Sequence, residues 1–136
     1  MRKIENEDLD LQEGVNIHRI AFEIYEGGEA EAELVRHKAP RTIETIIRVL
    51  PVRVRALVYL QAQVYFTLPV SIGLEKPTRT IEAGDVAFWP QGNAMCIFFK
   101  KIEPAGAVNL LGKVTKGLEL FEKVKLGTNI TVSLID

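Results

Sequence analysis

Few residues in this chain have the types and spacing that bond-making chemistry requires. The two histidines, His18 and His37, are far apart and lack the spacing of metal ligands. Cys96 is the only cysteine, and no histidine or cationic residue adjoins it to stabilise a thiolate. Asp85 follows a glycine, a position typical of a turn-forming residue. We therefore predict no metal site and no cofactor, leave the catalytic residues unassigned, and expect Cys96 to be a buried, poorly reactive thiol.

The stretch with the most chemical content is "GDVAFWPQGNAMCIFFKK", Gly84 to Lys101, which holds the only tryptophan. Side chains alternate across a strand, and both faces of this stretch are apolar. A core needs only one of them, so the second face must be covered by a helix, another subunit or a ligand. The pocket hypothesis places a ligand against Trp89 and either Phe98 or Phe99. Its polar partners would be Gln63, Tyr65, Gln91, Asn93 and Asn109.

The first half of the chain predicts a hairpin followed by a helix. Apolar and polar residues alternate over 20–25 and again over 30–34, and Gly27-Gly28 between them is a turn signal. Apolar residues then recur at helical spacing, which predicts an amphipathic helix between Pro40 and Pro51. The apolar stripe of that helix is formed by Ile43, Ile46, Ile47 and Leu50.

The second half predicts a series of short strands and one short helix. Period-two patterns cover 52–58, 64–68, 78–82, 85–89, 94–100, 108–114 and 129–135. A helix over 117–125, with Gly127 as its C-cap, precedes the last strand. The fold class is therefore mainly β, a closed β-barrel of about eight strands with two capping α-helices. We expect the first long strand to pair with the last, because closure removes exposed strand edges.

Length and charge exclude several broad classes. A chain of 136 residues fits one domain, which we place at 15–136 after an acidic N-terminal lead-in over 1–14. The net charge is -1, and the basic stretch from Arg36 to Arg55 contains no aromatic residue, so we predict no binding to nucleic acid. No apolar run approaches the length that spans a membrane. We therefore predict a cytoplasmic protein without membrane contact.

Three stretches resemble known sequences. "APRTIETIIRVL" resembles the first helix of cyclophilins, and Leu110 to Val124 resembles the segment that leads into their second helix. Gly84 to Phe99 and Val108 to Gly112 match the pattern of small prokaryotic cyclophilin-like proteins, Gly-Asp-(hydrophobic)2-(Tyr/Phe)-Trp-Pro-x-Gly-x-Ala-(Phe/Met)-Cys-Ile-Phe-Phe followed by Val-Asn-(hydrophobic)2-Gly. The resemblance runs from about Ala21 to the C-terminus and implies a cyclophilin-like barrel.

The resemblance also implies where prolyl isomerase groups should be, and they are replaced. The cyclophilin strand Phe-His-Arg-x-Ile-Pro corresponds to "VYFTLP", which puts Phe66 at the arginine position. The glutamine loop is replaced by "VSIGLEKP", and Val108 is near the histidine position in "PAGAVN". We therefore predict a protein that binds a peptide or small ligand on the aromatic face, Phe66 included, and does not isomerise prolyl bonds at the rate of a true cyclophilin. A weak peptidyl-prolyl isomerase and an oligomeric interaction module are the alternatives.

Overall fold

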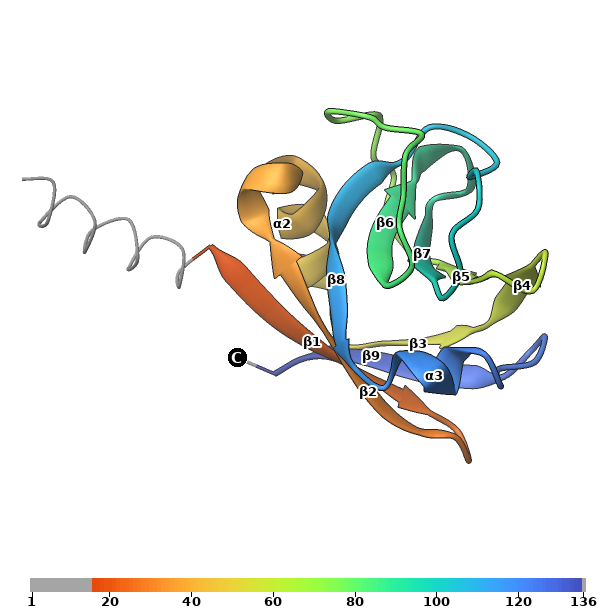
Figure 1. Ribbon diagram of the computed structural model, residues 1–136. Helices are drawn as coiled ribbons and strands as arrows, with labels where there is room; N and C mark the ends of the chain where they lie inside the picture. The colour runs from red at the N-terminus through yellow and green to blue at the C-terminus, as the bar shows by residue number, and fades with distance from the viewer. Residues whose placement is uncertain (1–15, 136) are drawn as a thin grey trace, which may run out of the picture.

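The computed structural model describes residues 16–135, so the predicted acidic lead-in over 1–14 lies outside the described residues. The described chain forms one antiparallel sheet in the strand order β3-β9-β1-β2-β8-β6-β7-β5-β4 (Figure 1). The strands are β1 (Ile17–Ile24), β2 (Gly28–Val35), β3 (Val52–Arg55), β4 (Leu57–Tyr59), β5 (Gln63–Thr67), β6 (Asp85–Trp89), β7 (Ala94–Phe98), β8 (Asn109–Lys116) and β9 (Asn129–Leu134). The helices are α2 (Pro40–Val49) and α3 (Leu118–Phe121), with the short 3-10 turns η1 (Arg36–Lys38) and η2 (Pro90–Gly92).

The sheet curls into a barrel because one bent segment of the chain forms the strands at both ends of the strand order. Strands β3 and β4 occupy opposite ends of the strand order, yet only Ala56 separates them in the sequence. The backbone N–H of Ala56 donates to the carbonyl of Thr128 at 2.8 Å, and its carbonyl accepts from Gly127 at 2.8 Å. The chain therefore pairs with β9 before Ala56 and with β5 after it, which splits the strand predicted over 52–58 into two.

The predicted barrel of mainly β class is confirmed, and so is the pairing of its first and last strands. Ile20 faces Leu134 and Ile24 faces Ile130 in the antiparallel ladder between β1 and β9. This pairing leaves β1 with a partner on each side, β2 and β9, as closure requires. The acidic hairpin predicted around Gly27 is the β1–β2 pair.

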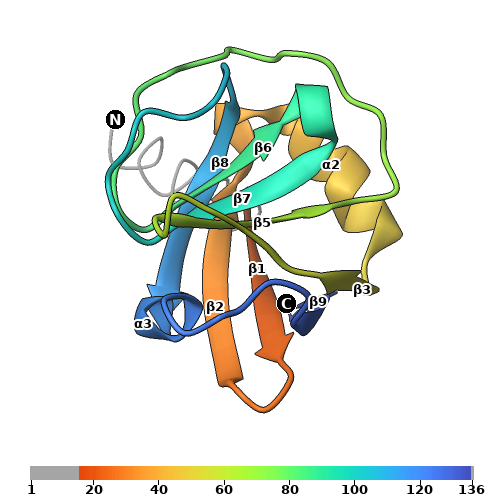
Figure 2. The same ribbon diagram turned by 90° about the vertical axis from the view of Figure 1, so that its right-hand side faces the viewer.

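Helix α2 closes one end of the barrel with the predicted apolar stripe. Ile43 and Ile46 are fully buried in the barrel interior, and Ile47 and Leu50 pack against it. Pro40 occupies the first helical position, where its missing N–H costs nothing, and the helix ends at Val49 before Pro51. Figure 2 shows α2 and α3 at opposite ends of the barrel. None of the helices over 16–135 is long and apolar enough to cross a membrane.

The interior of the barrel is filled by aromatic and aliphatic side chains. Phe22 packs edge-on against Phe121 from α3, with ring centroids 5.4 Å apart, and against Phe66 at 6.4 Å. Phe121 is buried, but α3 ends there, so the helix is shorter than the one predicted over 117–125. Gly127 lies in the turn before β9 and does not cap the helix; its φ of +89° suits that turn.

The strand predicted over 78–82 does not form. Residues 68–84 make a long loop around the outside of the barrel, and Thr78 contributes only one isolated bridge, to Val108 (Figure 2). The hydroxyl of Thr78 accepts from the backbone N–H of Thr80 at 3.0 Å. Such a local bond competes with ladder pairing, and the preceding Pro77 has no N–H to donate.

Candidate ligand-binding site

The second apolar face, outside the barrel, is covered largely by the chain's own loops. A cluster distinct from the barrel interior contains the buried side chains of Ala87, Cys96 and Phe98 on the sheet. Ile81 from the 68–84 loop and Val108 from the 99–108 loop cover them. Loops were not among the predicted covers, because irregular segments carry no periodic signal that shows what they pack against.

A cavity remains between the sheet and the 99–108 loop, and we call it the Trp89 pocket. Its volume is about 100 Å³. Strands β4, β5, β6 and β7 supply six of its side chains, and the loop that follows β7 supplies the rest. The pocket is lined by Tyr59, Gln63, Tyr65, Trp89, Cys96, Phe98, Pro104, Ala105 and Val108.

Strand register explains why a cavity forms here. Cys96 on β7 faces Tyr65 on β5 and Ala87 on β6, so two small side chains lie next to each other in the middle of the outer face. Tyr65 and Trp89 then lean toward each other at the edges, with ring centroids 6.3 Å apart and planes at 80°. Small residues between large aromatic ones leave space that the sheet itself cannot fill.

Two glycines set the position of the indole. A Cβ at Gly92 would lie 2.6 Å from Cε3 of Trp89, and a Cβ at Gly106 would lie 3.1 Å from its Nε1. Gly92 is therefore needed for the ring to lie where it does, and Gly106 allows the loop to pass close to the indole nitrogen. Asn93 lies between Gly92 and the start of β7 and has a φ of +48°. Its backbone carbonyl accepts a hydrogen bond from the backbone N–H of Leu68 at 2.8 Å.

Two buried polar atoms in this pocket have no hydrogen-bond partner within the described part of the chain. They are Nε1 of Trp89, a donor, and Oε1 of Gln63, an acceptor. The Gln63 side chain is only 6% exposed. Among residues 16–135, the side chains that line the pocket include no Asp, Glu, Lys, Arg or His. The site is therefore an uncharged aromatic cavity with one unpaired donor and one unpaired acceptor.

Asn109, predicted as a polar partner in the pocket, instead fastens the 68–84 loop to α2. Its Oδ1 accepts from the backbone of Glu75 at 2.7 Å, and its Nδ2 donates to Gly73 at 2.9 Å and to Thr42 at 3.1 Å. The Glu75 carboxylate in turn accepts from the backbone N–H groups of Thr42 and Arg41 at the start of α2. Burial acts to raise the pKa of Glu75, but these hydrogen bonds outweigh it and hold that pKa below its ordinary value.

Comparison with known proteins identifies the architecture. A family model described as cyclophilin-like matches residues 18–133. The chain belongs to the cyclophilin-like family. This match confirms the resemblance predicted from the stretch around Trp89 and from the helix after Pro40.

Solved structures show the same cyclophilin-like fold. The solution structure of the hypothetical protein AF2241 from Archaeoglobus fulgidus is 32% identical, with a TM-score of 0.77, and the match covers 88% of this chain and 96% of that one. A structure of McbB in complex with tryptophan has a TM-score of 0.70 at 14% identity, over 84% of this chain and 44% of that one, and shows the fold alone. A search of curated proteins finds no match.

The cyclophilin-like barrel brings four of the nine predicted site residues together in the pocket: Gln63, Tyr65, Trp89 and Phe98. Phe66 is fully buried against Phe22 in the barrel interior, so Tyr65, and not Phe66, faces the pocket from β5. Phe99 also belongs to the interior cluster. Gln91 and Asn93 lie in and just after η2, near the indole but outside the lining.

Five lining residues were not among the predicted ones: Tyr59, Cys96, Pro104, Ala105 and Val108. Cys96 could have been found, because it shares a strand face with Phe98 two positions later. Val108 was noted only as the replacement for a family histidine. The loop residues had no pattern that places them over β7.

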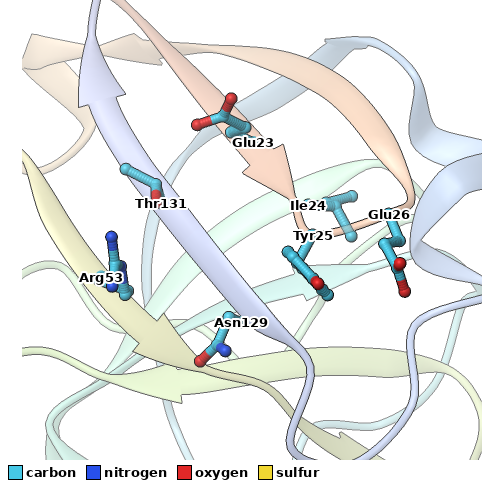
Figure 3. A pocket seen from close by; sticks show the side chains of 7 residues that line it. All are labelled: Glu23, Ile24, Tyr25, Glu26, Arg53, Asn129 and Thr131. Carbon is cyan, nitrogen blue, oxygen red and sulfur yellow. The ribbon is translucent and has the colours of Figure 1, made fainter.

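A larger and more open depression of about 410 Å³ lies on the outer face of β1, β9 and β3 (Figure 3). Glu23, Thr131 and Arg53 are register partners across these strands and project from the same face. Tyr25 at its edge is 66% exposed, and none of the described polar atoms here is buried without a partner. Charges in contact with water gain little from pairing. The Trp89 pocket is therefore the stronger candidate site.

Cys96 is expected to react slowly with a chromogenic thiol reagent in the native protein. Burial raises the pKa of its thiol to about 12, and the hydrogen bond with the Gln63 side chain opposes this only in part. Little thiolate, the reactive species, is then present near neutral pH. Because the folded-state pKa is the higher one, the protonated thiol favours the fold below its ordinary pKa, and this contribution is lost as the pH rises toward about 12.

Labelling in increasing urea should follow unfolding measured by circular dichroism. The control is Thr67→Cys in a Cys96→Ala background, since Thr67 is exposed and lies on the face of β5 that also carries Tyr65. That cysteine should label at once without urea. Equally rapid labelling of Cys96 in the native protein would contradict the prediction and reopen the nucleophile hypothesis.

Proposed function

We propose that this cyclophilin-like protein binds a small ligand, or one side chain of a peptide, in the Trp89 pocket. The observation that carries the proposal is the pair of buried, unpartnered polar atoms, Gln63 Oε1 and Trp89 Nε1, in one aromatic cavity. Buried polar groups in proteins are almost always paired, and an unsatisfied one costs about 1–3 kcal/mol. A ligand that supplies both partners recovers this cost, so this pair of atoms favours binding.

The lining supports binding more than catalysis. Proton transfer needs a group with a pKa near the working pH, and the described residues of the lining carry no carboxylate, imidazole or amine. The raised pKa of Cys96 also removes it as a nucleophile. The arginine donor that the resemblance to cyclophilins implies is replaced by Phe66, and among the described residues no cationic side chain lines the pocket in its place. We therefore rank the weak isomerase below a binding protein.

Other features of the chain fit a small-ligand binder. McbB, which shares the fold at 14% identity over 44% of its own chain, has been solved in complex with the small molecule tryptophan. The net charge of -1 supports our inference that neither nucleic acid nor membranes are partners. We keep the cytoplasmic location as an inference from the single, buried cysteine. A homo-oligomer in which a second copy covers the aromatic face is the remaining alternative.

The single tryptophan makes the test direct, because intrinsic tryptophan fluorescence of this protein reports Trp89 alone. The full chain is titrated with 2-pyrrolidinone and with N-acetylproline amide as probes. A saturable change in emission is expected with at least one of them. In Ala105→Phe, a large side chain at the exposed rim should occupy the pocket and abolish the response.

The matched control is Ala83→Phe, an equally exposed alanine that does not line the pocket, and it should keep the wild-type response. Circular dichroism establishes that both variants are folded. An emission change that fails to saturate, or that survives in Ala105→Phe, would overturn the proposed function. Analytical ultracentrifugation of the same samples tests the oligomer alternative. A dimer that dissociates in Ala105→Phe would show that a second copy of the chain, and not a ligand, covers the aromatic face.

A further inference from the structure

We propose that the pocket selects an uncharged amide that carries an N–H, such as a small lactam, and discriminates against prolyl amides. The ligand carbonyl would accept from Nε1 of Trp89, and its N–H would donate to Oε1 of Gln63. This inference rests on the proposed function, because it names the chemical class that the same pocket takes.

The two unpartnered atoms determine the polarity that a ligand must present. The indole N–H of Trp89 can only donate, so the ligand needs an acceptor at that point. The carbonyl oxygen of Gln63 can only accept, so the ligand needs a donor there. The same side chain also makes a hydrogen bond with Cys96, and it is 6% exposed, so its amide is held in place by its surroundings. A neutral ligand that carries both a donor and an acceptor offers the partner that each atom needs.

The lining determines the charge of the ligand. A buried ion needs a counter-ion or several hydrogen bonds, since its desolvation otherwise costs more than its contacts return. Within the part of the chain that the structure describes, no carboxylate, amine, guanidinium or imidazole lines the Trp89 pocket. A free amino acid or an ammonium group would therefore leave its charge unpaired there. The ligand group that enters the pocket is neutral.

The volume limits the size of the entering group. The cavity measures about 100 Å³. A dry cavity of about 150 Å³ in another protein holds benzene, so this one takes a ring of five atoms or a smaller group. The edge-to-face rings of Tyr65 and Trp89 favour a flat group between them. An amide in a five-membered ring meets the demands of size, charge and polarity together.

A prolyl peptide bond meets only part of these demands. Its ring has a suitable size and its carbonyl can accept from Trp89. The amide nitrogen of proline carries no hydrogen, however, so Oε1 of Gln63 would stay buried without a donor. The pocket should therefore prefer a ring with N–H over a prolyl ring of the same size. This preference distinguishes the inference from simple retention of a proline-binding recess.

The test compares three rings of similar size by NMR titration of the full chain: 2-pyrrolidinone, cyclopentanone and the pyrrolidinium ion. The first has donor and acceptor, the second only the acceptor, and the third a charge. We expect 2-pyrrolidinone to bind about 3–10-fold more tightly than cyclopentanone, because one additional hydrogen bond typically increases affinity by about this factor. Pyrrolidinium should cause no saturable shift of the amides of Ala87 and Cys96, which lie under the pocket.

Two variants assign the selectivity to the named atoms. Gln63→Met keeps the length of the side chain and removes the acceptor, so the preference for 2-pyrrolidinone over cyclopentanone should disappear. Trp89→Phe removes the indole donor, so 2-pyrrolidinone and cyclopentanone should both bind more weakly while the preference between them remains. If Gln63→Met does not fold, the comparison in the wild-type protein still decides the inference.

The outcomes separate this inference from the proposed function. Equal affinity of the wild-type protein for the two neutral rings, or tighter binding of pyrrolidinium, overturns the amide class and leaves the pocket as a binding site. A preference for 2-pyrrolidinone that persists in Gln63→Met also overturns it. No saturable shift with any ring overturns both the inference and the proposed function.

Discussion

Replacement of Gly112 by alanine is expected to destabilise the protein by about 3 kcal/mol or more. Gly112 lies in the middle of the sheet on β8, where it pairs with Leu34 on β2 and Val86 on β6. A Cβ at this position would lie 1.8 Å from the carbonyl oxygen of Glu33 and 3.0 Å from Cα of Leu34. These atoms belong to the backbone of β2, so no rotamer change can relieve the contact.

The strain must be relieved by separation of β2 from β8, which breaks the ladder that joins the first hairpin to the rest of the barrel. Urea unfolding followed by circular dichroism measures the effect. The matched control is Gly73→Ala, since nothing lies within 4 Å of a Cβ there. That variant should stay within about 0.5 kcal/mol of the wild type. Equal stability of the two variants would show that the β2–β8 contact is looser than described.

Replacement of Ile46 by aspartate should have an effect of similar or greater size, about 4 kcal/mol. Ile46 is fully buried between α2 and the barrel interior. Loss of a buried aliphatic side chain alone costs about 2–5 kcal/mol. The carboxylate adds a desolvation cost without a cationic partner among the side chains of that interior cluster.

The pH dependence of this variant separates the two contributions. Burial would raise the pKa of the introduced carboxyl, so the charge penalty is present at neutral pH and falls as the carboxyl becomes protonated. Thermal melting at neutral and at mildly acidic pH should therefore show a partial recovery for Ile46→Asp and none for Ile46→Ala. Arg48→Ala, which removes only an exposed ion pair with Glu44, is the surface control and should change stability by less than about 1 kcal/mol. An unchanged melting temperature for Ile46→Asp would show that the stripe is not buried.

Much of the barrel could be predicted from local patterns, because those patterns depend on neighbours in the sequence. Period-two alternation located β1, β2, β5, β6, β7, β8 and β9, and the spacing of the isoleucines located α2 between its two prolines. The pairing of β1 with β9 also followed, since a closed sheet must join its chain ends. The break at Ala56 did not, because a change of pairing partner depends on residues far along the chain.

The candidate site was predicted only in part, because its lining also depends on residues far apart in the sequence. Tyr65 was predicted and faces the pocket, whereas Phe66 was included because it occupies the arginine position of the resemblance, and it lies in the barrel interior. Asn109 is polar in a buried strand, and only the fold shows that its partners are Glu75 and Thr42.

The fold class, the family and the two apolar faces of the stretch around Trp89 could all be predicted from local patterns, because each depends on residue type and short-range spacing. What lies over the outer face could be known only from the folded chain. Val108 and Ala105 come to the pocket from a loop without periodicity, and the burial of Val108 removes its apolar side chain from water. The unpaired atoms of Gln63 and Trp89 could likewise be recognised only once every neighbour was in place, since an unsatisfied hydrogen bond is a property of three-dimensional surroundings and not of a residue.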